Sequence, residues 1–488
     1  MEMEQGRSYL RARGSPGYGS NSRAKVNLTM AVNNDTMVVV VPFPAQGHLN
    51  QLLHLSRLIA DYNIPVHVIT TTTHARQANA RTRIENASIH FHHFPTPHFP
   101  SPPPDPNSLI KFPTQLIPSF KSAMHLRQPF KHLLSTLMAK RVVVVFDYLM
   151  GPVVQDVALF DNVEAYMFSC CSAFASFWYT YEATGRPSLD QDLALIQNEL
   201  PTNEDCYSMD GWQFIASVDV SCNKFSSGTI YDASWVIEPK FIELIQQSHD
   251  QEDGDGQKTW ALGPFNPVEI TQMEQSKRHK LFDWLDKQAP NSVLYVSFGT
   301  TTSISNDQVQ EIGLGLERSE QKFIWVLRDA DKGDIFEGKV RKIKLPEGFE
   351  ERVGENGLVV VDWVPQLEIL EHPATGGFMS HCGWNSCMES MTMGVPVAAW
   401  PMHSDQPRNA MLLTKVLKVG MYVRDWTQRK ELVSGTLVEQ AVRRLMATEE
   451  GEEMRKRAAE LGDKVRQSMM DGGVTRMELD SFVAHMSR

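Results

Sequence analysis

Apolar runs of strand length alternate with amphipathic stretches along most of the chain. Residues 37–43 form one such run, and Leu49, Leu52, Leu53 and Ile59 after it recur at helical spacing. This alternation predicts parallel sheets whose faces are covered by helices. The further strands that we expect in the first half are residues 66–71, 89–94, 142–146 and 165–168.

The pattern restarts after a charged, glycine-containing segment at residues 248–256. Strands are then expected at residues 292–298, 322–328, 358–363, 377–381 and 396–400, with helices near 306–318, 385–393 and 406–419. Two facing halves of this kind place a cleft at the carboxyl ends of both sheets. We therefore predict an α/β fold of two facing, doubly wound, Rossmann-like domains.

The same patterns set the expected domain boundaries. Residues 1–29 lack the apolar core of a signal peptide, and Glu2 and Glu4 argue against a transit peptide, so we interpret them as a disordered extension or as sequence upstream of a true start at Met30. Proline-rich residues 93–118 and residues 185–228 are expected to be irregular and to form binding walls. The remaining parts are a first domain at 30–250, a linker at 251–265, a second domain at 266–463 and a final helix at 464–488 that packs back on the first domain.

Composition narrows the class of protein further. The formal net charge of −11 over 488 residues speaks against nucleic-acid and membrane partners. Six scattered cysteines form neither a disulfide framework nor a zinc motif, which favours a reduced, cytoplasmic protein. Apolar runs stay below the ~18 residues that span a bilayer. We expect a monomer without a bound metal or cofactor.

The most informative chemistry lies where a strand ends at His381 and a helix begins at Trp384. Unpaired backbone N–H groups at a helix start suit a diphosphate, and side chains of His381, Asn385 and Ser386 add donors. Trp363, before a proline, offers a face for stacking on a base. For any one of these residues, a helix cap or a core aromatic is an equally good explanation.

Residues 363–406 as a whole resemble the donor-binding box of plant family 1 UDP-glycosyltransferases, with Trp-x-Pro-Gln, His-Cys-Gly-Trp-Asn-Ser, Glu and Asp-Gln in register. The resemblance implies the fold called GT-B and UDP-glucose as co-substrate. It implies uracil stacking by Trp363 beside Val364, and ribose binding by Gln366 and Glu389. It further implies diphosphate contacts from His381, Asn385, Ser386 and the turn of Ser297 and Thr300, and sugar contacts from Trp384, Asp405 and Gln406. In this family a final Gln, here Gln406, usually accompanies glucose.

A second candidate site lies at the turn of residues 42–48. His48 follows the first strand and Asp147 follows a later one, so both lie at the carboxyl edge of the sheet. By itself such a histidine is more often structural, and such an aspartate is a strand-end cap. The turn resembles the Pro-Phe-Pro-x-x-Gly-His motif of the same family, which implies that His48 is the general base and Asp147 orients it. A helix start nearby is expected to keep His48 neutral.

These roles imply one displacement that inverts the anomeric carbon. An alcohol is too weak an acid to ionise first, so proton transfer to His48 and attack are concerted. His381 and the helix start stabilise the departing UDP in place of a metal. The competing interpretations are a metal-dependent transferase using Asp253-Gly-Asp255 or Asp329-Ala-Asp331, a sugar-nucleotide binder without turnover, and a dinucleotide oxidoreductase.

The acceptor is the least determined feature. Residues 42–50, 73–78 and 401–409 resemble the zeatin O-glucosyltransferase group of the family, which implies a cytokinin hydroxyl as acceptor. A xylosyl-transferring relative shares much of this sequence, so UDP-xylose stays open. Flavonoids, terpenoids and other small alcohols also stay open, because irregular loops carry no readable code for pocket shape.

Overall fold

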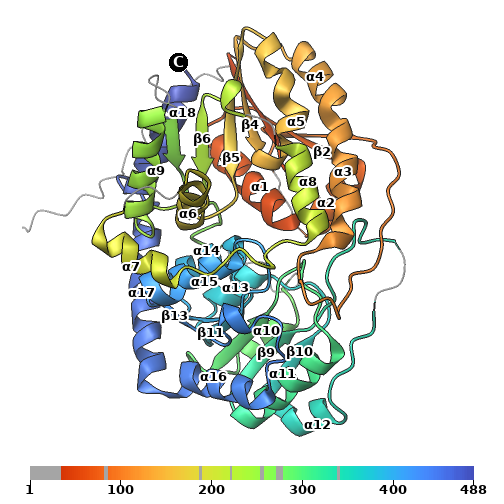
Figure 1. Cartoon of the computed structure of the whole chain (residues 1–488), viewed down its shortest axis with the longest axis vertical. Coiled ribbons are helices and arrows are strands. Elements are labelled where there is room, and N and C mark those ends of the chain that lie inside the picture. Colours follow the sequence, from red (N-terminus) through yellow and green to blue (C-terminus); the bar gives the residue numbers. More distant parts are fainter. Residues whose placement is uncertain are drawn as a thin grey trace, which may run out of the picture.

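A computed structural model gives the structure of the chain and describes residues 35–81, 86–185, 189–219, 222–252, 258–270, 278–337 and 341–488. The expected extension at residues 1–29 lies outside the described residues. Two α/β lobes are stacked along the long axis of the molecule, with the amino-terminal lobe at the top of Figure 1.

The first lobe is built on a parallel sheet because its strands are nearly continuous apolar runs. Val38 to Val41 and Val142 to Val145 are buried on both faces, as parallel strands between helix layers require. The described strands run in the order β3-β2-β1-β4-β5-β6-β7. They are β1 (Thr36–Val41), β2 (Val66–Thr71), β3 (Ile89–Phe94), β4 (Arg141–Asp147), β5 (Val163–Ser169), β6 (Gly228–Tyr231) and β7 (Lys258–Ala261).

Helices cover both faces of this first sheet. Val38 and Val40 pack with α1 and α18, whereas Val39 and Val41 pack with the helices of the other face. The helices of the lobe are α1 (Gln46–Ala60), α2 (Thr72–Arg81), α3 (Ile117–Ala123), α4 (Arg127–Thr136), α5 (Gly151–Val154), α6 (Ala173–Ala183), α7 (Gln191–Glu199), α8 (Met209–Val218) and α9 (Pro239–Glu252).

The second lobe repeats the design. Its described strands run in the order β10-β9-β8-β11-β12-β13, all in parallel pairs. They are β8 (Val293–Ser297), β9 (Lys322–Val326), β10 (Gly357–Val360), β11 (Thr375–Ser380), β12 (Val397–Ala399) and β13 (Gly420–Tyr422). The helices are α10 (Leu281–Leu285), α11 (Asn306–Ser319), α12 (Phe349–Val353), α13 (Gln366–Glu371), α14 (Trp384–Met393), α15 (Gln406–Met411), α16 (Gly435–Ala447) and α17 (Glu449–Ser468).

One apolar core crosses from lobe to lobe. Phe174 and Trp178 of α6 and Phe241 of α9 belong to the same buried cluster as Trp384 and Met411 of the second lobe. The two lobes are therefore packed together beside the cleft, which fixes how the ends of the two sheets face each other.

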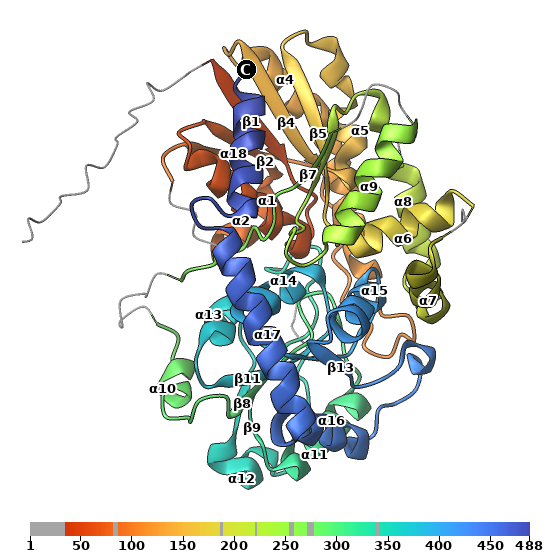
Figure 2. The same ribbon diagram turned by 90° about the vertical axis from the view of Figure 1, so that its left-hand side faces the viewer.

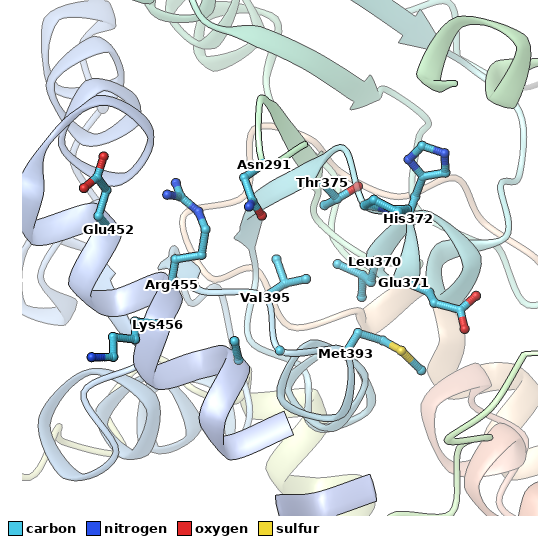
Figure 3. A pocket seen from close by; sticks show the side chains of 13 residues that line it. Asn291, Leu370, Glu371, His372, Thr375, Met393, Val395, Glu452, Arg455 and Lys456 are labelled. Carbon is cyan, nitrogen blue, oxygen red and sulfur yellow. The ribbon is translucent and has the colours of Figure 1, made fainter. Parts of the chain in front are cut away.

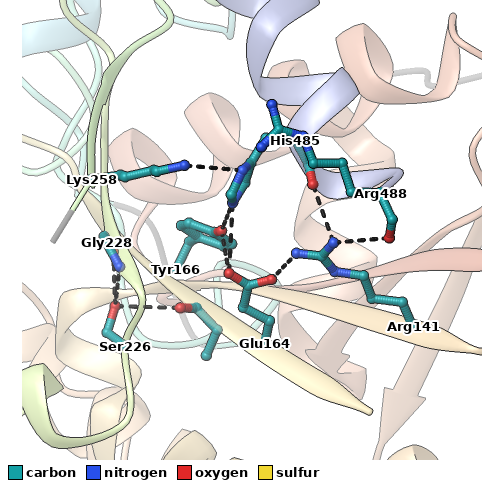
Figure 4. A network of polar contacts seen from close by, with 9 residues as sticks. Arg141, Glu164, Tyr166, Ser226, Gly228, Lys258, His485 and Arg488 are labelled. Carbon is teal, nitrogen blue, oxygen red and sulfur yellow. Dashed lines mark hydrogen bonds and ion pairs between the residues drawn. The ribbon is translucent and has the colours of Figure 1, made fainter. Parts of the chain in front are cut away.

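The carboxyl-terminal residues return to the first lobe. Helix α17 runs up the side of the molecule, and α18 (Val474–Met486) lies beside β7 (Figure 2). Phe482 packs edge-on against Trp260 and Tyr166. The Nε2 atom of His485 lies 2.6 Å from the Tyr166 hydroxyl, in the polar network of Figure 4.

The structure confirms the strands expected at both sheets and corrects three segments. Residues 185–228, expected to be irregular, contain helices α7 and α8. The expected linker at 251–265 contains β7, an edge strand of the first sheet. The single helix expected at 464–488 is the end of α17 and all of α18, separated by a turn. Within the described ranges, no helix combines the length and apolar character needed to cross a bilayer.

Candidate functional site

A cavity of about 1700 Å³ lies between the lobes, at the carboxyl ends of both sheets. Both lobes contribute to its wall, through the turns after β1, β4 and β5 on one side and after β8 and β11 on the other. The cavity brings together every site residue expected from the sequence, namely His48, Asp147, Ser297, Thr300, Trp363, Val364, Gln366, His381, Trp384, Asn385, Ser386, Glu389, Asp405 and Gln406.

His48 and Asp147 form a hydrogen-bonded pair in this cavity. The Nδ1 atom of His48 lies 2.7 Å from Oδ2 of Asp147, and the N–H of Leu149 donates to the other carboxylate oxygen at 3.0 Å. Asp147 is 1% exposed and both its oxygens are bonded, so its orientation is fixed. With Nδ1 donating to Asp147, Nε2 of His48 carries the lone pair.

The pKa of His48 differs from the expectation. Burial lowers this pKa, but the charge and hydrogen bond of Asp147, with a contribution from the charge of Asp405, raise it above its ordinary value. The expected effect of the α1 start, which favours neutral imidazole, is therefore outweighed. The carboxylates make Nε2 a stronger base, which suits proton abstraction.

His381 is a different kind of histidine. Burial lowers its pKa to about 4, so the ring is neutral at pH 7. Two glycines lie against it, because a Cβ on Gly299 or on Gly383 would lie 2.5 or 2.6 Å from its Nε2. Gly299 also has φ +75°, a conformation that favours glycine. The Nδ1 atom has no hydrogen-bond partner among the described residues.

The start of α14 lies next to His381, and the first N–H groups of a helix have no partner within the helix itself. Gly383 is its N-cap residue and supplies no side chain to cap the first N–H groups. Free N–H groups and the positive end of the helix dipole attract an anion. The helix start and the neutral ring of His381 together form a site that attracts negative charge through dipoles and N–H donors rather than through a positively charged side chain.

Three residues that the sequence assigns to ribose and phosphate binding are joined by hydrogen bonds. Gln366 Nε2 donates to Ser386 Oγ at 2.9 Å and to Glu389 Oε2 at 2.7 Å. Burial raises the pKa of Glu389 to about 7. Nearby, Trp363 is 45% exposed at the cavity rim, which leaves an aromatic face open, whereas Val364 is buried.

Asp405 and Gln406 also line the cavity. Asn409 Nδ2 donates to Asp405 at 2.8 Å, and Gln406 Oε1 accepts from the N–H groups of Met402 and His403 at 2.9 and 3.0 Å. His403, which the sequence analysis did not single out, has its Nε2 3.1 Å from Thr301 Oγ1. The Gln406 amide nitrogen lies 3.3 Å from Nε2 of His403.

Two residues of the donor box hold the lobes together. The Trp384 indole N–H donates to the carbonyl of Asp232 at 2.7 Å, so this donor is not free for a sugar hydroxyl. The Asn385 amide donates to the Gly47 carbonyl at 2.9 Å and accepts from Gln51 at 2.5 Å. The expected ligand contacts of these two side chains therefore compete with contacts between the lobes.

Of the two acidic strings considered as metal ligands, the structure describes the one from Asp329 to Asp331. Asp329 accepts from Ser303 at 2.5 Å, and Asp331 forms an ion pair with Arg328 at 2.8 Å. Neither aspartate lines the cavity. Asp253 and Asp255 lie outside the described residues.

The acceptor side of the cavity is rich in aromatic rings that sequence reasoning did not identify. They come from the turn after β1, from α3, α6 and α8, and from the segments expected to be irregular, and include Phe43, Phe112, Phe120, Tyr179, Tyr207, Trp212 and Phe214. Tyr207 packs on Trp212 at 4.6 Å between ring centroids. The recurrence of aromatic residues in these stretches was the available signal.

A smaller cavity of about 400 Å³ lies elsewhere on the second lobe, between α17 and the chain before β11 (Figure 3). It shares no lining residue with the central cavity. Arg455 points toward it but donates to the carbonyls of Gly376 and Leu445. This cavity is therefore not part of the same site.

Comparison with known proteins agrees with the two-lobed site. Residues 34–267 match the family described as glycosyltransferase, N-terminal domain, and residues 269–450 match UDP-glucuronosyl and UDP-glucosyl transferase. The chain is 53% identical to a zeatin O-glucosyltransferase of Phaseolus lunatus, over 94% of this chain and 99% of that one. It is 52% identical to a zeatin O-xylosyltransferase of Phaseolus vulgaris, over 94% of this chain and all of that one.

Solved structures show the same fold. A glycosyltransferase of Siraitia grosvenorii in complex with UDP superposes with a TM-score of 0.71 at 25% identity, covering 93% of this chain and all of that one. The fold, the cavity between its lobes and the close sequence relatives lead to one conclusion. The chain belongs to the plant family 1 UDP-dependent glycosyltransferases.

Proposed function

We propose that this enzyme transfers glucose from UDP-glucose to the side-chain hydroxyl of a cytokinin, with inversion and without a metal. The observation that carries the proposal is that one cavity holds both the His48–Asp147 pair and the anion site of His381 and α14. A base and a site for the leaving diphosphate are what a single displacement needs.

On the acceptor side, His48 takes the hydroxyl proton at Nε2 while the oxygen attacks the anomeric carbon. Asp147 keeps the Nδ1 proton in place and stabilises the imidazolium as it forms, which its 2.7 Å contact supports. Attack from the face opposite the leaving group converts an α-linked donor into a β-glucoside.

On the donor side, the leaving UDP develops negative charge at its β-phosphate. His381, Ser386, Ser297, Thr300 and the N–H groups at the α14 start are proposed to stabilise that charge. Trp363 stacks on uracil, and its exposed face supports this role. The hydrogen-bonded set of Gln366, Ser386 and Glu389 is suited to bind the ribose hydroxyls, because an ionised carboxylate accepts charge-assisted hydrogen bonds.

The sugar is proposed to lie against Asp405 and Gln406. Asp405 supplies acceptor oxygens. The Gln406 carbonyl accepts from the backbone, so its amide nitrogen, which also lies 3.3 Å from Nε2 of His403, is the proposed donor to the sugar. UDP-xylose is the second candidate donor, because a relative 52% identical to this chain bears the name O-xylosyltransferase.

The choice of cytokinin rests on two observations. Two relatives above 50% identity are named for zeatin, and the acceptor wall is aromatic. Aromatic side chains stack on a flat purine ring while a short side chain reaches His48. Flavonoids, terpenoids and other small alcohols are the alternative acceptors. We also propose a cytoplasmic monomer, and the six unpaired cysteines support a reducing compartment.

The test is to incubate the purified enzyme with UDP-glucose or UDP-xylose and a panel of cis-zeatin, trans-zeatin, dihydrozeatin, flavonoids and terpenoid alcohols, with products read by mass. A hexose adduct on a zeatin that disappears in His48→Ala supports the proposal. A pentose adduct moves it to UDP-xylose. Turnover of another acceptor, with every zeatin untouched, contradicts the cytokinin assignment and keeps the enzyme class. Addition of EDTA is expected to leave the rate unchanged.

A further inference from the structure

A cysteine lies against the proposed catalytic base. Cys170 follows β5 directly, and its Sγ is 3.6 Å from Nε2 of His48. Because Nδ1 of this ring donates to Asp147, the thiol is the donor and Nε2 the acceptor in this contact. Atoms of His48, Asp147 and Cys170 that are able to bind a metal all lie within 4.8 Å of one another.

The separation of the sulfur and nitrogen atoms suits a tetrahedral metal ion. Zinc binds thiolate at ~2.3 Å and imidazole at ~2.0–2.1 Å, so a tetrahedral angle places the two ligand atoms about 3.6 Å apart. That is the distance from Cys170 Sγ to His48 Nε2. The two side chains would not have to move apart or together to share one ion.

The surroundings complete such a site. A metal-bound histidine usually donates its other ring N–H to a carboxylate, and Asp147 already accepts that bond at 2.7 Å. Cys170 and His48 both line the central cavity, so an ion has a route of entry and water can fill its two remaining positions. Cys171, the next residue, also lines the cavity but is not part of the close group.

We propose that Cys170 and His48 form an inhibitory site for a thiophilic divalent cation of the zinc class. On binding, the thiol releases its proton to solvent, metal–sulfur and metal–nitrogen bonds form, and His48 keeps its Nδ1 proton. The ion then occupies the Nε2 lone pair that must accept the proton of the acceptor hydroxyl. Binding depends only on the geometry, whereas inhibition rests on the proposed role of His48 as base.

Binding is tested with Co²⁺ as a spectroscopic probe of the full-length protein, because a cobalt–thiolate bond gives a charge-transfer absorption. The band is expected in the wild type and in Cys171→Ser, and it is expected to be lost in Cys170→Ser. His92→Gln serves as a further control, since Nδ1 of His67 lies 2.8 Å from Nε2 of His92 and this histidine pair is a second place for a metal. Its band is expected to equal that of the wild type.

Inhibition is tested by titrating Zn²⁺ into the transfer assay, with each variant compared with its own rate in EDTA. Cys170→Ser is expected to need at least about tenfold more Zn²⁺ for half inhibition, because one of two protein ligands is lost. Equal sensitivity of Cys170→Ser and the wild type, or absence of the thiolate band, overturns the site and leaves the proposed function untouched. A Cys170-dependent band with undiminished transfer overturns the inhibition and contradicts His48 as the base.

Discussion

The contact between two glycines and His381 gives a sharp test of the anion site. A methyl group on Gly383 would place Cβ 2.6 Å from Nε2 of His381, whereas ordinary van der Waals contact begins at 3.4 Å. The ring must therefore move by about 0.8 Å. Gly383 has φ −59°, so Gly383→Ala adds this clash without backbone strain.

The magnitude follows from the bond that the displaced ring loses. A hydrogen bond to a charged group contributes about 1.5–3 kcal/mol, which corresponds to roughly 10–150-fold weaker binding of UDP. A Cβ on Gly299 would lie 2.5 Å from the same Nε2 atom, and Gly299 also has a positive φ. Gly299→Ala is expected to weaken UDP binding to a similar degree and to cost a further 1–2 kcal/mol of stability, as an order of magnitude.

The assay is calorimetric titration with UDP, combined with thermal unfolding. Gly472→Ala is the matched control for backbone strain, because Gly472 has φ +82° and open space around its Cβ position. In a double-mutant cycle, Gly383→Ala is expected to add nothing once His381 is alanine. Wild-type affinity for UDP in Gly383→Ala would refute the view that the ring position matters. If Gly383→Ala weakened UDP binding by the same factor in the His381→Ala background, the methyl group would act on something other than the His381 ring.

Three further predictions concern the base, the uracil site and a buried acid. Because Asp147 raises the pKa of His48, Asp147→Asn is expected to shift the acid limb of the kcat/KM pH profile to lower pH and to lower its plateau ~10²–10⁴-fold; an unmoved limb contradicts this. Trp363→Ala should weaken UDP binding by ~1–3 kcal/mol and Trp363→Phe far less, by titration, with both variants folded because the side chain is half exposed. Burial raises the pKa of Glu238 to about 8, so its neutral form stabilises the fold below the ordinary pKa of a glutamate, and this stability is lost as pH rises toward 8. The midpoint of urea unfolding is therefore expected to fall between pH 5 and 9 in the wild type, and to fall less in Glu238→Gln. An equally steep fall in the variant would rule out Glu238 as the cause.

The sheets could be predicted from the sequence because parallel strands buried on both faces leave an unambiguous signal. Strands β1 and β4 each contain four consecutive valines, and the structure has them where the pattern places them. Strands β6, β7 and β13 were missed because they are only three or four residues long, and β7 and β13 are edge strands. Such short strands carry little apolar periodicity, so only pairing with their neighbours reveals them.

The residues that line the cavity were predicted better than the hydrogen bonds between them. A strand end followed by a glycine and a helix start locates His381 without knowledge of the other lobe. Nothing local in the sequence indicates that Asn385 bonds to Gly47, that Cys170 reaches His48, or that carboxylates outweigh the helix start at His48. These features depend on how the lobes and strands meet, and that is set by tertiary packing.

The bond from Asn385 to Gly47 connects the two halves of the chemistry. Gly47 precedes His48 in the first turn of α1, and Asn385 lies in the first turn of α14. The helix start proposed to bind the diphosphate is therefore bonded to the helix turn that carries the proposed base. Gln51, one turn further along α1, donates a hydrogen bond to the side-chain oxygen of Asn385. These two bonds therefore join the proposed donor site in the second lobe to the proposed base in the first lobe. A diphosphate that binds the Asn385 amide must compete with these bonds, so we expect donor binding to be coupled to the position of His48 through this one side chain.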